Sequence, residues 1–131
     1  MPQHGTVRIA VIVLALATAA IHLSRALADP KIGPLFGLNA VGYVLLVAAL
    51  YAPGLQHPAL HRLLRRVLLV YTAITIVLYV VWGVMSGEWA LYLGPLDKVC
   101  EVVLLVLLWI EEQADGSGYT AANPLAARRQ E

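Results

Sequence analysis

Charged residues are scarce in this chain, and their scarcity indicates its class. Asp, Glu, Lys and Arg make up 13% of the 131 residues, whereas hydrophobic residues make up 60%. A soluble domain usually carries about a quarter charged residues. The formal net charge is +1, which excludes a strong electrostatic attraction to nucleic acid or to anionic lipid. We therefore expect a membrane protein with no nucleic-acid partner.

The chain also lacks the residues of several common sites. Its single cysteine, Cys100, excludes an intrachain disulfide. The sequence contains no glycine-rich phosphate loop and no regular spacing of metal ligands, so it predicts no metal site. Ser24 and Ser86 stand in no recognisable nucleophile context, and a histidine with a glutamate is a weak catalytic signal by itself. The sequence therefore favours a protein that is not an enzyme.

Long apolar runs are what the sequence has in abundance. A membrane-spanning helix needs roughly 20 mostly apolar residues. Four runs fit that length, at about 7–27, 34–52, 64–85 and 95–110. The connections between them are short, so consecutive helices should be antiparallel neighbours. The predicted fold class is an all-α membrane protein, with four transmembrane helices in an up-down antiparallel bundle.

The ends of these runs are marked by proline and by a change in composition. Proline stands at positions 30, 34, 53, 58 and 95, where helices typically begin or end. From residue 113 the chain turns polar and small, and such a segment cannot fold alone. We therefore expect one transmembrane domain over residues 1–112, followed by a polar tail over residues 113–131.

The first apolar run also has features of a secretory signal peptide. Arg8 precedes the run, and the small residues of Ala26–Asp29 follow it. However, the run is long enough to span a membrane, and His22 and Arg25 would lie very close to the cleavage point. We expect the segment to be a retained helix.

The basic residues predict the orientation. With four spans, the termini and the second loop share one side of the membrane. That side holds six basic residues, namely Arg8, Arg62, Arg65, Arg66, Arg128 and Arg129, against Arg25, Lys31 and Lys98 on or near the other. The positive-inside rule then places both termini in the cytoplasm and the chain in the inner (plasma) membrane as a multi-pass protein. The run His61–Arg66 is interpreted as a topology anchor in preference to a phospholipid-headgroup site.

Polar residues recur at helical spacing within the apolar runs. At about 1.5 Å per residue, His22, Asn39 and Glu101 lie ~7–9 Å from the outer ends of their helices. Ionisable groups facing lipid are costly, so we expect these polar stripes to turn inward. Glu101 should then meet His22, Arg25 or Lys98 in a buried cluster that opens to the extracytoplasmic side. The predicted ligand-binding residues are His22, Arg25, Asn39, Tyr43, Tyr79, Trp82, Asp97, Lys98 and Glu101.

Several of these residues also fit a purely structural role. Asp97 suits the positive first turn of a helix, and the Lys98 side chain is long enough to reach the membrane interface. Thr72 and Thr75 are interpreted as packing residues, because threonine readily bonds its own helix backbone. His22 and Glu101 are the strongest functional candidates, because ionisable groups inside a membrane are costly and therefore often mark functional sites.

Three functions fit this pattern. The first is binding or moving a small ligand, a lipid headgroup or a proton. The second is a non-catalytic accessory subunit of a larger membrane complex, with membrane lipid, a second copy or a larger complex as partner. The third is a redox protein in which His22, Tyr43 or Tyr79 binds a quinone. His22 is the only histidine inside a predicted span, which argues against a bis-histidine haem.

Overall fold

The structure is a computed structural model that describes residues 2–89 and 93–122, with side chains described for residues 5–89 and 93–115. In these ranges the chain is all-helical and has no strand, which confirms the predicted all-helical architecture. Its elements are α1 (Pro2–Ala28), α2 (Gly33–Tyr51), the short 3₁₀ helix η1 (Pro53–Leu55), α3 (Pro58–Ser86) and α4 (Leu93–Ala122).

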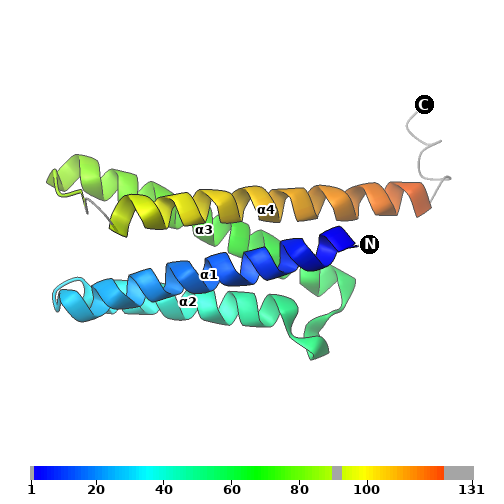
Figure 1. Ribbon diagram of the computed structural model, residues 1–131, viewed down its shortest axis with the longest axis horizontal. Helices are drawn as coiled ribbons and strands as arrows, with labels where there is room; N and C mark the ends of the chain where they lie inside the picture. The colour runs from blue at the N-terminus through cyan, green and yellow to red at the C-terminus, as the bar shows by residue number, and fades with distance from the viewer. Residues whose placement is uncertain (1, 90–92, 123–131) are drawn as a thin grey trace.

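The four long helices lie side by side along a common direction (Figure 1). α1 packs against α2 and α4, and α3 packs against the same two helices, so the bundle is a ring of four. Consecutive helices run in opposite directions. One end of the bundle therefore holds the start of α1, the α2–α3 connection and the end of α4, while the α1–α2 connection lies at the opposite end (Figure 1).

Local sequence explains where the helices begin and end. Pro34 and Pro58 occupy the first turns of α2 and α3, where a missing N–H costs little. α3 stops at Gly87, whose φ of 70° suits glycine and whose N–H donates to the Gly83 carbonyl at 3.0 Å. α4 continues to Ala122, into residues expected to form a polar tail. No proline interrupts that stretch before Pro124.

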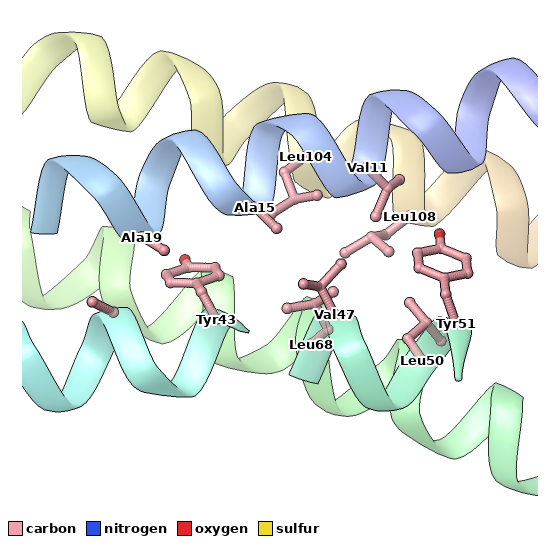
Figure 2. Packing of buried hydrophobic residues seen from close by; sticks show 11 residues of the cluster. Val11, Ala15, Ala19, Tyr43, Val47, Leu50, Tyr51, Leu68, Leu104 and Leu108 are labelled. Carbon is pink, nitrogen blue, oxygen red and sulfur yellow. The ribbon is translucent and has the colours of Figure 1, made fainter. Parts of the chain in front are cut away.

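The buried core is narrow and runs along the bundle axis, as Figure 2 shows. Small residues of α1, Ala15 and Ala19, are buried and allow the neighbouring helices to approach closely. Larger side chains from the other three helices fill the centre (Figure 2), among them Tyr43, Val47 and Leu50 of α2, Leu68 of α3, and Leu104 and Leu108 of α4.

α2 and α3 meet closely where α2 has a glycine. A Cβ atom at Gly42 would overlap the Tyr71 hydroxyl, which instead donates to the Asn39 carbonyl at 3.1 Å. The Tyr71 ring also packs edge-on against the Tyr43 ring, with centroids 5.1 Å apart. Gly42 thus permits the contact that fixes Tyr43 near the middle of the bundle.

Most apolar side chains face outward. Leu27, Val84 and Met85 are 81%, 72% and 82% exposed, and many other large apolar side chains are at least 40% exposed. Exposed apolar surface of this extent marks contact with a membrane or with other proteins. Three helices, α1 from Gly5, α2 and α3, are long and apolar enough to cross a membrane. α4 carries Asp97, Lys98 and Glu101 in its first turns and is not one of the three.

Candidate functional site

A group of polar side chains lies inside the bundle, and every long helix contributes to it. We call it the central cluster. It consists of His22 from α1, Tyr43 from α2, Thr75 from α3, and Asp97, Lys98 and Glu101 from α4.

Glu101 has the most partners in the central cluster and is completely buried. Its Oε1 atom accepts hydrogen bonds from the Tyr43 hydroxyl at 2.9 Å and from Thr75 Oγ1 at 2.8 Å. Its Oε2 atom accepts a hydrogen bond from Lys98 Nζ. An ionised carboxylate only accepts hydrogen bonds, so three donors from three helices match the charged form of this side chain.

Lys98 bridges the two carboxylates of the central cluster. Its Nζ atom lies 3.0 Å from Asp97 Oδ2 in addition to its contact with Glu101. The same ammonium lies 5.2 Å from the centroid of the Tyr79 ring, a cation–π distance. The other Asp97 oxygen, Oδ1, is buried and receives no hydrogen bond from any described residue, although Asp97 is only 4% exposed.

His22 faces that unpartnered oxygen. Its Nδ1 atom lies 2.9 Å from the Thr18 carbonyl oxygen and 3.5 Å from Asp97 Oδ1. Because a carbonyl oxygen can only accept, Nδ1 carries a hydrogen and donates it to Thr18. The separation of 3.5 Å is too long for a good hydrogen bond, so Asp97 Oδ1 stays unsatisfied. In a neutral ring the lone pair is then on Nε2.

In the central cluster two carboxyl groups share one ammonium group. With both carboxyl groups ionised and the imidazole neutral, its described residues carry one net negative charge. Taking ions out of water is costly unless they are paired and hydrogen-bonded. The arrangement therefore favours binding of a further positive charge, and disfavours an anion.

The structure gathers five of the nine predicted residues into the central cluster, namely His22, Tyr43, Asp97, Lys98 and Glu101. Of the three partners predicted for Glu101, Lys98 makes the direct contact. His22 instead faces Asp97.

The other four predicted residues lie at the margin or elsewhere. Tyr79 packs edge-on against Trp89 at 5.6 Å, beside the Lys98 ammonium. The Oδ1 atom of Asn39 is buried without a partner in the described structure. Trp82 is 50% exposed, and the Arg25 side chain makes no described hydrogen bond or ion pair with the central cluster.

Sequence reasoning missed Thr75 as a member of the site. Thr75 Oγ1 does lie 2.8 Å from the expected acceptor on its own helix, the Thr72 carbonyl oxygen, although its single hydrogen serves only one full hydrogen bond. The same hydroxyl also reaches Glu101 and lies 3.0 Å from the Tyr43 hydroxyl. Thr75 precedes Tyr79 by four residues, a helical spacing that places both on one face of α3. That spacing could have indicated the site, but the contact with Glu101 depends on how α4 packs against α3.

A second group of charges lies at the bundle end that holds the α2–α3 connection. We call it the end cluster: Arg65, Arg66, Glu112 and Asp115. Arg65 is completely buried, with Nε 3.2 Å from Glu112 Oε2 and Nη1 2.7 Å from Asp115 Oδ2. Arg66 Nη2 lies 2.7 Å from Glu112 Oε1. Burial alone would raise the pKa of Glu112, but the hydrogen bonds from Arg66 and Arg65 outweigh it and hold that pKa below its ordinary value.

Two open apolar grooves lie on the outer surface. One runs between α1 and α2 and includes Leu16, Val44 and Tyr51, and the other follows α3 past Val70 and Ile74. No residue of the central cluster lines either groove. The predicted extracytoplasmic opening involves the loop before α4, of which residues 90–92 lie outside the described structure.

Fold and site together define a helical protein with several apolar helices, compatible with a membrane protein, and with a charged cluster inside the bundle. No protein-family model, curated protein or solved structure matches the chain.

Proposed function

We propose that the chain is a multi-pass membrane protein in which α4 is a fourth span and both termini are cytoplasmic. Support for the fourth span comes from the way α4 lies along the other helices (Figure 1). Asp97 and Glu101 are buried in the bundle, whereas Val99, Val102 and Val106 on the same helix are exposed. α4 therefore presents an apolar face outward and a polar face inward. Support for the orientation comes from the excess of basic residues on one side.

We further propose that the central cluster binds a small cation. The observation that carries this proposal is the buried pair of carboxylates, Asp97 and Glu101, which share the single ammonium of Lys98. The unbalanced negative charge lies where water cannot solvate it well. Binding a positive charge there relieves the penalty of the unpaired Asp97 oxygen.

A small ligand fits better than a large one. The polar atoms of the central cluster already lie within hydrogen-bonding distance of one another, and the two grooves are elsewhere on the surface. Of the ligands considered from the sequence, a lipid headgroup would require the most rearrangement and a proton the least.

A thermal-shift series tests the cation proposal. The purified protein is heated in detergent with Na⁺, K⁺, Mg²⁺ or Zn²⁺, and over a range of pH, at constant ionic strength set with choline chloride. A ligand that binds the folded state raises the unfolding temperature by mass action. We expect at least one cation, or acidification, to raise Tm for the natural protein and not for Glu101→Gln.

Glu88→Gln is the matched control, because Glu88 is exposed and lies outside the central cluster. It should respond as the natural protein does. If every cation changes the Tm of Glu101→Gln as much as that of the natural protein, the central cluster is a structural fastener and the proposal is wrong.

The accessory-subunit and quinone functions stay predictions. For a quinone, the candidate hydroxyl of Tyr43 is already bonded to Glu101, and Tyr79 packs on Trp89. Native mass spectrometry of the gently extracted protein tests both. A partner of fixed stoichiometry would support a subunit role, and a bound quinone would support a redox role.

A further inference from the structure

Three potential metal ligands meet inside the bundle. His22, Asp97 and Glu101 each offer one nitrogen or oxygen atom, and these three atoms all lie within 4.8 Å of one another. All three residues are buried, and they come from helices at opposite ends of the sequence, α1 and α4. One imidazole and two carboxylates form a donor set that suits first-row divalent ions such as Zn²⁺.

A second observation, an unpartnered carboxylate oxygen, also points to a cation as the ligand. Asp97 Oδ1 is buried, faces His22 and has no donor among the described residues. Burying a carboxylate oxygen without a hydrogen-bond partner is costly. A cation could bind Asp97 Oδ1 without breaking any hydrogen bond that this atom makes in the described structure. Thr18 Oγ1, one turn before His22, is also buried and has no partner among the described side chains.

The residues behind these ligands are arranged as in metal sites. A ligating histidine usually donates its other N–H to a carbonyl or carboxylate, which fixes its tautomer and orientation. His22 donates from Nδ1 to the Thr18 carbonyl, so the nitrogen that would bind the metal is Nε2. Ligating carboxylates are themselves hydrogen-bonded, and Glu101 is held by the hydroxyls of Tyr43 and Thr75.

The positive charge of Lys98 disfavours metal binding at this site. Its position also indicates where a metal ion would lie. Its ammonium bridges Asp97 Oδ2 and Glu101 Oε2, the place that a cation between two carboxylates would take. The side chain is 15% exposed and already touches the face of Tyr79, and a lysine stem is long enough to move its charge toward an interface.

We propose that His22, Asp97 and Glu101 form an intramembrane site for a divalent transition-metal ion such as Zn²⁺, and that the ion displaces Lys98 as their counter-ion. This inference rests on the proposed cation-binding function and names the class of cation. Two carboxylates neutralise the divalent ion, and the lysine ammonium moves outward.

Zn²⁺ binding to the purified full-length protein in detergent tests the site, with Co²⁺ as a spectroscopic probe. We expect one ion per chain and a visible Co²⁺ spectrum typical of mixed nitrogen and oxygen ligands. His22→Ala should weaken Zn²⁺ binding by more than roughly tenfold, the range seen when even supporting residues of a metal site are lost. His57→Ala, which changes a histidine in the α2–α3 connection, should bind as the natural protein does.

Lys98→Met gives a second readout. Without the competing ammonium, Zn²⁺ should bind more tightly and should raise the unfolding temperature more than it does for the natural protein. The proposal is overturned if His22→Ala binds Zn²⁺ as tightly as His57→Ala, or if neither the natural protein nor Lys98→Met responds to Zn²⁺. A protein stabilised by Na⁺ or by acid but not by Zn²⁺ would overturn the metal site and leave the proposed function standing.

Discussion

The central cluster and the end cluster both join α4 to its neighbours through carboxylates, but they lie at different depths. Glu101 is completely buried and meets side chains of α2, α3 and its own helix. Glu112 and Asp115 have side chains that are 22% and 45% exposed, and they pair with arginines of α3. The end cluster has equal numbers of acidic and basic groups, whereas in the central cluster two carboxyl groups share one ammonium group, beside the His22 imidazole.

The depth of a charged group in the bundle changes its effect on stability. In the end cluster, Arg65 is buried, but Arg66 and the two carboxylates are partly exposed and share their charge with water, and exposed ion pairs contribute little to stability. In the interior, buried carboxyl groups are shielded from solvent, so an unbalanced charge there carries a large penalty. Three substitutions and one pH series test this difference between the clusters.

Lys98→Met should have the largest effect. It leaves Asp97 and Glu101 in the interior without a counter-ion, and breaking a buried ion pair costs about 3–5 kcal/mol. Thermal unfolding in detergent with a chelator measures the loss. The double variant Lys98→Met/Glu101→Gln should recover part of it, because one of the two charges is gone. Equal stability of the natural protein and Lys98→Met would show that the central cluster is solvated, as the carboxylates of the end cluster partly are.

Tyr43→Phe should have the next largest effect. The hydroxyl of Tyr43 donates to a charged carboxylate, a bond that contributes about 1.5–3 kcal/mol. Tyr71→Phe is the matched control on the neighbouring helix, because its hydroxyl donates to a neutral carbonyl and should cost about 0.5–1.5 kcal/mol. If the control loses as much stability as Tyr43→Phe, the carboxylate at position 101 gives the hydrogen bond no added strength.

Glu112→Gln should have a small effect that salt removes. Its partner Arg66 is 67% exposed at the side chain, and Arg65 keeps its contact with Asp115. We expect a loss of less than about 1 kcal/mol. At 1 M salt, where the Debye length is about 3 Å, the difference from the natural protein should shrink further. A large loss of stability in Glu112→Gln that does not depend on salt would show that the end cluster is shielded from solvent as the central cluster is.

The smallest effect is the acid response of Glu112. Its folded-state pKa is lowered, so its stabilising contribution is fully present above its unfolded pKa of about 4.3 and is lost as the pH falls through the lower folded value. Glu112→Gln should lack this part of the acid-induced loss. Unfolding temperatures of the two proteins between neutral pH and that range measure the difference. Identical curves would show that the arginines do not shift the titration of this carboxyl group.

Much of the bundle follows from local sequence signals. Apolar length predicts the four helices, and prolines predict where α2 and α3 begin. The stripe of Ala15, Thr18, Ala19 and His22 at helical spacing is buried in the structure. These features depend on residues close together in the chain, so a sequence pattern can predict them.

The pairings within each cluster depend on residues far apart in the chain. The sequence offered Arg25, Lys98 and His22 as partners for Glu101, and only the rotation of α1 against α4 directs His22 to Asp97 instead. The run His61–Arg66 predicts a topology anchor, but it does not predict that Arg65 is buried against Glu112 and Asp115, a contact that exists because α4 continues past the predicted span.

Local sequence patterns therefore account for the apolar helices and for the polar stripes along them. They do so because helix period, proline and hydrophobicity act over a few residues. The tertiary structure alone decided that His22, Asp97 and Glu101 present their ligand atoms to one another, with Lys98 between the two carboxylates. Those contacts depend on the relative rotation and axial shift of whole helices, which the packing of small residues sets and no local pattern records.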